Sequence, residues 1–234
     1  MDPDDGCGLR WGGRILRALD RAPAESPAAL FVRHSARGAF TDIAHALDVP
    51  LSDEGRREAV RFGRSLPLSR RVRLGHSPVE RCEETARLIA EGVTLAGGTA
   101  EVEGMDFDLG GPYLVDPRAM VRLAGEGDFP RAWLDGRIPE DVVQPAPVAA
   151  QGQAAVSIRA IGRGEPGDLW ILVSHDWNIL VVREVLFGLR HEDVGWVDFL
   201  DGIAFFRAPG GLAASLALPD GGTVVASVPA GWSD

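Results

Sequence analysis

Two arginines flank a histidine in one short stretch of the chain, which contains Arg33, His34 and Arg37. Guanidinium groups this close together form a fork that suits a doubly charged group rich in oxygen atoms. A histidine between them can attack such a group or donate a proton to it. A phosphoryl group is the natural match, although surface charges beside a strand-end histidine explain this stretch, taken alone, about equally well.

The residues before this trio predict a buried strand. Ala28 to Val32 is apolar without interruption, as in parallel strands that are covered on both faces. A second strand of this kind is predicted over 169–174, and His175 and Asp176 follow it directly. Open α/β sheets bind ligands at the carboxyl ends of their strands, so we expect Arg33, His34 and Arg37 at that edge. His175 and Asp176 alone also fit a helix cap or half of a metal site, but such metal sites need further ligands and are surrounded by helices.

Two helix starts are predicted nearby. Ser52 can cap the first helix, since serine is a favoured N-cap residue. Asp53 and Glu54 follow it where the helix dipole favours negative charge. The second follows the turn at Ser77 and carries Arg81 in its first turn, where a cation opposes the dipole by ~0.3 to 1 kcal/mol. A bound anion would relieve that conflict, since helix N-termini are ready anion sites.

The composition excludes several classes of function. The chain has 234 residues, a length typical of one α/β domain, and its formal net charge of −10 argues against a general nucleic-acid binder or a membrane-surface protein. All 24 basic residues are arginines, so the chain offers neither a Schiff-base lysine nor a P-loop lysine. Cys7 and Cys82 show no metal-ligand spacing. The N-terminus is acidic where a signal peptide is basic, and no apolar run approaches ~18 residues, so we expect a cytoplasmic protein.

Three motifs of this chain, and the order in which they occur along it, resemble those of the histidine phosphatase superfamily, which has the phosphoglycerate mutase-like fold. The resemblance spans residues 28–207 and includes a second histidine after a late strand, here His175. It implies a three-layer α/β/α sandwich with a mostly parallel central sheet. The motifs are Arg33-His34-x-x-Arg37, Leu51-Ser52-x-x-Gly55 and Ser77-Pro78-x-x-Arg81-x-x-x-Thr85-Ala86.

The resemblance also implies roles for the site residues. His34 would be the nucleophile that forms a phosphohistidine, and Arg33, Arg37 and Arg81 would hold the phosphoryl oxygens. His175 would donate to the same group as charge builds in the transition state. Phosphoryl transfer needs mainly positioning and charge neutralisation, so we expect a small phosphorylated ligand and neither a metal nor another cofactor.

The proton donor for the leaving oxygen has two candidates. The pair His175-Asp176 resembles the acid-phosphatase branch of the family, in which the aspartate after the second histidine is the acid, so Asp176 is the first choice. In the mutase-like branch the acid is a carboxylate that precedes a glycine in an earlier loop. Asp106 fits that place best, with Asp108 and Glu103 behind it, although a plain turn rich in aspartate and glycine explains that segment about equally well.

Ser35 departs from the family pattern, which has glycine after the nucleophilic histidine. A serine there would narrow the phosphate site or add a hydroxyl hydrogen bond to the phosphate. Three functions therefore stay open. We favour a phosphatase that hydrolyses a phosphate monoester; the others are a phosphomutase that uses the same residues and a catalytically weak module that binds a phosphorylated ligand.

The chain is predicted to form one domain. Residues 1–27 are interpreted as a tail with a short helix, and 28–234 as the histidine phosphatase-like domain. Its segment 104–148 is either a helical cap over the site or a set of plain connecting helices. Alternating stretches beyond residue 203, separated by glycine-rich turns, predict hairpin strands at one edge of the sheet. Trp196 and Phe199 are interpreted as packing residues.

Overall fold

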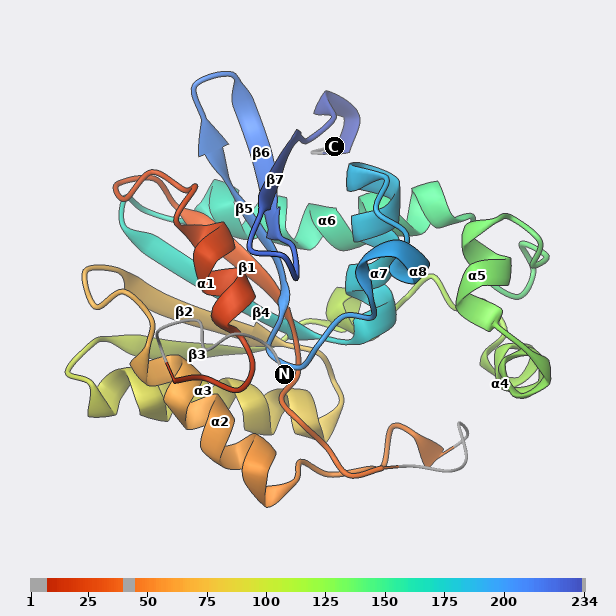
Figure 1. Ribbon diagram of the computed structural model, residues 1–234, viewed down its shortest axis with the longest axis horizontal. Helices are drawn as coiled ribbons and strands as arrows, with labels where there is room; N and C mark the ends of the chain where they lie inside the picture. The colour runs from red at the N-terminus through yellow and green to blue at the C-terminus, as the bar shows by residue number, and fades with distance from the viewer. Residues whose placement is uncertain (1–7, 40–44, 233–234) are drawn as a thin grey trace.

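The chain folds around one sheet, seen in a computed structural model that describes residues 8–39 and 45–232, so Cys7 lies outside the described part. Within that part the sheet has seven strands, in the order β3-β2-β4-β1-β5-β6-β7 (Figure 1). The first four in this order are parallel, and β5, β6 and β7 continue as antiparallel neighbours. The expected α/β class and the hairpin strands at one edge are confirmed, and the sheet is mixed. The strands are β1 (Ala28–Arg33), β2 (Arg71–His76), β3 (Ala100–Met105), β4 (Asp168–Ser174), β5 (Gly202–Ala208), β6 (Gly211–Ala217) and β7 (Thr223–Ser227).

Helices cover both faces of this sheet (Figure 1). The strand side chains alternate between two cores, because successive residues of a strand point to opposite faces. In β1, Leu30 and Val32 join the core under α1, α2 and α3, whereas Ala29 and Phe31 join the core under α6 and α7. The helices are α1 (Gly13–Leu19), α2 (Asp53–Arg64), α3 (Glu80–Leu95), α4 (Pro117–Glu126), α5 (Phe129–Leu134), α6 (Ala146–Arg163), α7 (Asp176–Phe187) and α8 (His191–Val194), with the 3-10 turns η2 (Phe107–Gly110) and η3 (Ala230–Trp232).

The helix starts near the predicted site form as local sequence dictates. Ser52 caps α2, because its Oγ accepts a hydrogen bond from the backbone N–H of Gly55 over 3.0 Å. Val79 is the residue before α3, so Arg81 lies in the first turn of that helix, as expected. The helix after the second histidine ends at Gly188, whose φ of 68° suits a glycine C-cap.

β3 was not expected from the sequence. Its burial alternates along the strand, and it pairs in parallel only with β2, so it forms one edge of the described sheet. β3 ends at Met105. The first residues of the expected 104–148 insertion therefore belong to the sheet edge, and the helical part of the insertion is α4 and α5.

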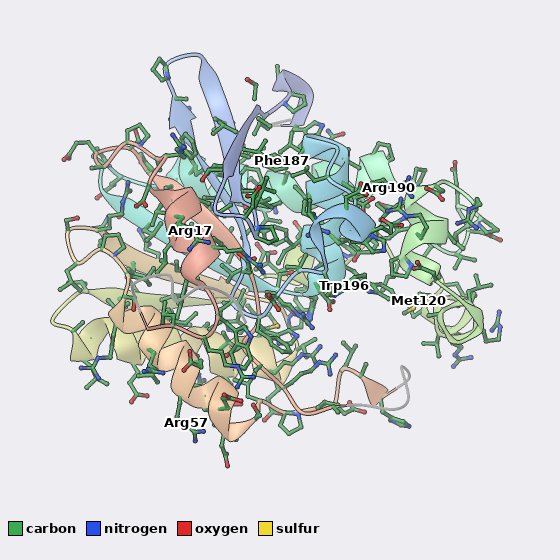
Figure 2. All side chains as sticks on the ribbon, viewed as in Figure 1. Arg17, Arg57, Met120, Phe187, Arg190 and Trp196 are labelled. Carbon is green, nitrogen blue, oxygen red and sulfur yellow. The ribbon has the colours of Figure 1, made fainter. Side chains whose placement is uncertain are left out.

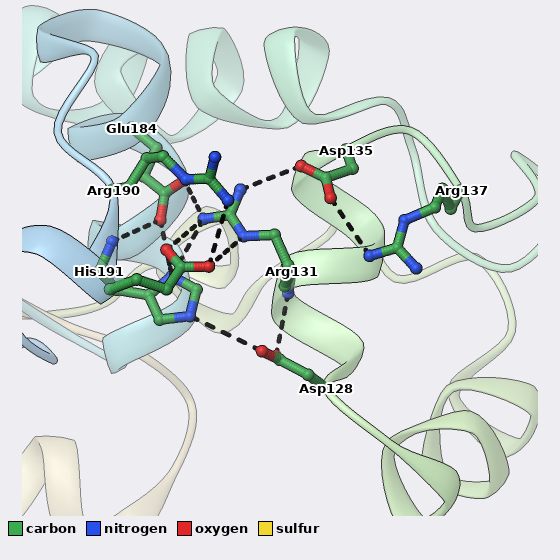
Figure 3. A network of polar contacts seen from close by, with 8 residues as sticks. Asp128, Arg131, Asp135, Arg137, Glu184, Arg190 and His191 are labelled. Carbon is green, nitrogen blue, oxygen red and sulfur yellow. Dashed lines mark hydrogen bonds and ion pairs between the residues drawn. The ribbon is translucent and has the colours of Figure 1, made fainter.

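The insertion is fastened to the rest of the domain by an ion-pair network centred on Arg131 of α5 (Figure 3). Its Nη2 lies 2.5 Å from Glu184 of α7, and its Nε lies 2.6 Å from Glu192 of α8. His191 joins through Nδ1, which lies 2.7 Å from Glu184. This network ties α5 to the helix that begins at Asp176. A role as a cap over the site stays a prediction.

Among the described residues, every helix is too short or too polar to cross a lipid bilayer.

α2 and α3 pack against each other through glycines. A Cβ on Gly63 would lie 2.1 Å from the carbonyl oxygen of Ile89, and a Cβ on Gly92 would lie 2.1 Å from that of Val60. The two backbones are therefore in contact, without intervening side chains. Because Arg81 lies in the first turn of α3, this contact also fixes where Arg81 stands relative to α2.

We expect Gly63→Ala to lower the free energy of unfolding by about 2 kcal/mol or more, because its methyl group would have to displace backbone. Gly152→Ala is the matched control, since Gly152 lies in α6 and nothing is within 4 Å of its Cβ position. That replacement should raise the free energy by about 0.5 to 1 kcal/mol. Urea unfolding measures both effects, and a harmless Gly63→Ala would contradict the backbone contact.

Candidate active site

The carboxyl ends of four neighbouring strands bring the candidate residues to one edge of the sheet. Arg33 at the end of β1 pairs with Ser174 at the end of β4, so His34 and His175 follow at matched positions. Their ring centroids lie 5.6 Å apart. β2 and β3 end at the same edge, where Ser77 follows β2. The structure thus brings together two histidines that are far apart in the sequence.

His34 is held in one tautomer. Its Nδ1 lies 2.8 Å from the carbonyl oxygen of Ser35, which only accepts, so Nδ1 carries the proton. Arg81 Nε donates to the other ring nitrogen, Nε2, over 2.9 Å. The residue is 2% exposed, and burial, together with the charge of Arg81, lowers the pKa of His34 well below its ordinary value. His34 therefore presents a neutral, unprotonated Nε2, which is the form that a nucleophile requires.

His175 is uncharged as well. Its Nδ1 lies 3.3 Å from Arg81 Nη2, which only donates, so Nδ1 is the acceptor. Its Nε2 then carries the proton and donates to Ser77 Oγ over 2.8 Å. Burial, and next the charge of Arg81, lower the pKa of His175 to about 3. Both imidazoles are neutral in the free protein at pH 7.

Arg81 lies at the centre of the site, and its side chain reaches both histidines. Its Nη1 donates to the carbonyl oxygens of Ala46 over 3.0 Å and Leu47 over 2.9 Å. These acceptors offset the conflict between its charge and the dipole of α3. The guanidinium is thereby fixed beside His34 Nε2, where a phosphoryl oxygen would need a donor.

Arg33, which is buried, and Asp176, which is partly exposed, form an ion pair beside the histidines. Arg33 Nη2 lies 2.9 Å from Asp176 Oδ2, and the indole N–H of Trp196 donates to the same oxygen over 3.1 Å. Burial alone would raise the pKa of Asp176, but the charge of Arg33 and the bond from Trp196 outweigh it, and the net shift is downward. Asp176 is therefore ionised in the free protein.

Arg37 and Ser35 complete the first motif. Arg37 is half-buried and donates to the carbonyl oxygen of Gly38 over 3.0 Å. Burial lowers the pKa of Arg37, and the charges of Arg81 and Arg33 lower it further, so the three guanidiniums repel one another across the site. The Ser35 hydroxyl points away to α2, where it donates to the carbonyl oxygen of Gly55 over 2.7 Å. A contact between this hydroxyl and a phosphate would require that bond to break.

The three motifs are joined to one another by hydrogen bonds. The backbone N–H of Ser35 donates to Thr85 Oγ1 over 3.1 Å, and that of Ser52 donates to the carbonyl oxygen of Ala36 over 3.0 Å. A Cβ on Gly55 would lie 2.0 Å from the same carbonyl oxygen, so only glycine allows α2 to start here. The loop 34–37, which carries His34, is therefore fixed from both α2 and α3.

The other candidate carboxylates have partners of their own. Asp106 caps η2, because its Oδ1 accepts from the backbone N–H of Asp108 over 2.9 Å. Asp108 itself pairs with Arg159 over 2.5 Å, and Glu103 pairs with Arg73. Asp106 stands at the same sheet edge as the histidines, since its backbone N–H donates to the carbonyl oxygen of His76 at the end of β2.

Sequence reasoning missed the loop 196–201. Trp196 lies beside α8 (Figure 2), and its indole N–H donates to Asp176 Oδ2. The centroid of the Phe199 ring lies 4.2 Å from the guanidinium carbon of Arg33. No sequence pattern marks such contacts, because they depend on how a loop returns from α8 to β5. Both aromatic residues belong to the site as well as to the packing.

One group in the described part of the chain has the donor atoms for a metal ion, and it lies outside this site. It consists of Asp128, His191 and Glu192. Arg131 occupies the same place and binds Glu192 through its guanidinium (Figure 3). A cation there would meet a positive charge, so we describe this group as part of the ion-pair network.

Comparison with known proteins identifies a family. The family model of the histidine phosphatase superfamily (branch 1) matches residues 29–199. None of the curated protein sequences matches the chain significantly.

Solved structures show the same fold at low sequence identity. A mycobacterial glucosyl-3-phosphoglycerate phosphatase is 17% identical with a TM-score of 0.55, and 82% of this chain covers 97% of that one. Bacillus stearothermophilus YhfR is 16% identical with a TM-score of 0.54, at 80% and 94% coverage. Phosphoserine phosphatase from Entamoeba histolytica, in complex with 3-phosphoglyceric acid, is 16% identical with a TM-score of 0.50, at 86% and 95% coverage.

The neutral imidazoles predict how stability depends on pH. His34 and His175 have folded-state pKa values below the unfolded value of about 6.5, so the unfolded chain binds more protons as the pH falls below it. The free energy of unfolding should fall between pH 6.5 and 5 by up to about 1.4 kcal/mol per pH unit for each of the two imidazoles. Urea unfolding at several pH values measures this slope.

The variants His34→Asn and His175→Asn test which groups cause this slope. Each removes one titrating imidazole and keeps a polar side chain, so each should remove about half of the slope that these two groups contribute. A slope that equals the wild-type slope in both variants would show that the two rings are not the neutral groups described above.

Proposed function

Because the chain belongs to the histidine phosphatase superfamily, branch 1, we propose that it hydrolyses phosphate monoesters through a phosphohistidine on His34. One observation carries this proposal. The unprotonated Nε2 of His34 lies 2.9 Å from Arg81 Nε, with the ring of His175 beside it. The proposed nucleophile therefore lies next to a hydrogen-bond donor for the phosphoryl oxygens. Covalent catalysis of this kind divides one difficult displacement into two easier ones.

In the first step the substrate phosphoryl group takes over the hydrogen bond that Arg81 Nε gives to His34 Nε2 in the free protein, and the freed lone pair attacks phosphorus. The bond between phosphorus and the ester oxygen breaks, and the departing alcohol takes a proton from a carboxylic acid of the protein. In the second step water attacks the phosphohistidine and gives a proton back to that carboxylate. The bond between phosphorus and nitrogen breaks, inorganic phosphate leaves, and His34 and the acid regain the forms in which they began the first step.

Arg33, Arg37 and Arg81 would neutralise the phosphoryl oxygens. Their mutual repulsion is a feature that a bound dianion relieves, which favours binding of the doubly charged group over a neutral one. A dianion beside His175 would also raise the pKa of that imidazole. His175 would then gain a proton and donate to the phosphoryl group as its charge develops.

Asp176 is the proposed proton donor for the leaving oxygen. In the free protein its ion pair with Arg33 keeps it ionised. A phosphoryl group that engages Arg33 would weaken this pair and add a negative charge nearby, and both changes raise the pKa of Asp176. Asp176 would thus take up a proton when substrate binds and could then donate it to the leaving oxygen. Asp106 stays the second candidate, because it stands at the same edge of the sheet.

The substrate is proposed to be a small phosphorylated metabolite. The Entamoeba histolytica phosphatase, which has the same fold, was solved with 3-phosphoglyceric acid, and this supports a ligand of that size. A release assay over a panel of phosphorylated sugars, sugar acids and amino acids measures which ester is cleaved fastest.

We expect His34→Ala to reduce hydrolysis of p-nitrophenyl phosphate by about a thousandfold or more, since no other side chain replaces the nucleophile. Wild-type protein that is quenched during turnover should carry an acid-labile phosphate on His34, detectable by mass spectrometry. An unchanged rate in a folded His34→Ala variant would refute the proposed function.

Asp176→Asn should slow hydrolysis of an alkyl phosphate about a hundredfold more than hydrolysis of p-nitrophenyl phosphate, because only the poor leaving group needs a proton. Asp106→Asn is the matched control, with the same loss of charge at the same sheet edge, and should show no such difference. Steady-state rates with both substrates decide between the two carboxylates. The opposite pattern would make Asp106 the acid.

A further inference from the structure

We propose that the N-terminal segment from Trp11 to Arg14 is a brace that positions Arg33 for phosphate binding, with Trp11 and Arg14 as positioning residues. The inference rests on the proposed function, in which Arg33 holds phosphoryl oxygens. The segment precedes residues 29–199, which match the family model. It lies in the part of the chain that the sequence suggested to be a tail.

The loop 196–201 holds Arg33 in place. The carbonyl oxygen of Val197 accepts from Arg33 Nη1 over 2.7 Å, and the Phe199 ring lies 4.2 Å from the guanidinium carbon. The same loop binds the backbone of Arg33 twice, because the carbonyl oxygen of Asp201 accepts from its N–H over 2.9 Å and the N–H of Leu200 donates to its oxygen over 3.1 Å. Apart from the Asp176 carboxylate, the described contacts that orient this guanidinium come from this loop.

This loop is strained and needs support. Leu200 has a φ of 55°, and it is the only non-glycine residue with a positive φ in the described part of the chain. A branched side chain is unfavourable in that conformation, which persists only where the surroundings impose it. Leu200 is also fully buried, so it cannot relax toward solvent. Some other element must therefore fix the loop.

The N-terminal segment supplies that support at three points. Arg14 Nη2 lies 2.7 Å from Asp198 Oδ2, and its Nε lies 2.7 Å from Asp201 Oδ2, so one guanidinium joins two positions of the loop. The Trp11 ring packs edge-on against Phe199 with ring centroids 5.4 Å apart. A continuous path of contacts thus runs from Trp11 through Phe199 to Arg33.

The brace is itself anchored. The backbone N–H of Arg10 donates to Glu58 Oε2 over 3.0 Å, and the Arg10 guanidinium pairs with Glu54, so the segment is attached to α2. α1 begins at Gly13 within this segment and buries Ile15 and Leu19 in the core that it shares with α2 and α3. The loop 196–201 is therefore held between the sheet and α2, the same helix that contacts the loop 34–37.

The test is binding of inorganic phosphate to the full chain, measured by titration calorimetry well below the unfolding midpoint. Arg14→Ala should weaken phosphate binding about tenfold, because a displaced Arg33 no longer holds its guanidinium in the position that binds phosphate. Arg21→Ala is the matched control, since Arg21 is an exposed arginine just after α1 and its loss removes the same charge. It should leave the affinity unchanged. A merely structural role of Arg14 would lower the midpoint without changing the affinity of the folded protein.

Trp11→Leu provides an independent test, and it decides the question if Arg14→Ala does not fold. It should also weaken phosphate binding, and Trp11→Phe, which keeps an aromatic edge against Phe199, should largely restore it. Wild-type protein that does not bind phosphate would refute the phosphate site and the inference with it. Wild-type binding that is unchanged in both Arg14→Ala and Trp11→Leu would refute the brace and leave the proposed function intact.

Discussion

The site depends on burying positive charge that the protein itself only partly neutralises. Arg33, Arg37 and Arg81 converge on two imidazoles that burial keeps neutral, and the Asp176 carboxylate pairs with Arg33. Such an arrangement is costly, since guanidiniums lose hydration and repel one another. The fold sustains it because each side chain stands at a strand end or a helix start that hydrogen bonds fix. An arriving dianion meets donors that are already oriented.

The surrounding elements hold the site residues in place through hydrogen bonds and backbone contacts. The loop 34–37 is hydrogen-bonded to α2 through Gly55 and to α3 through Thr85, and α2 and α3 are in backbone contact through Gly63. The three motifs are therefore parts of one rigid unit. The insertion with α4 and α5 is attached by the ion pairs of Arg131 and by Phe129 and Trp133, which are buried in the core (Figure 3).

Much of this could be predicted from the sequence, and physical reasons explain what could not. The runs 28–32 and 169–173 are apolar throughout, which marks strands buried on both faces, and the residues after them fall at one sheet edge. β3 escaped prediction because Glu101 and Glu103 alternate with smaller residues, as suits an edge strand half in solvent. Trp196 and Asp176 are 20 residues apart, and the brace at Arg14 joins segments 184 and 187 residues apart. Both arise from tertiary packing, which leaves no local pattern.

The concentration of donors around one phosphoryl position has a kinetic consequence. In the proposed function the site residues bind the phosphoryl group, and inorganic phosphate presents the same oxygens as the ester from which it came. The same donors would therefore hold the product, and product release limits the rate of many enzymes. In a phosphatase built this way, departure of the product would set the pace with activated esters, and the features that distinguish one alcohol from another must lie outside the cluster of arginines.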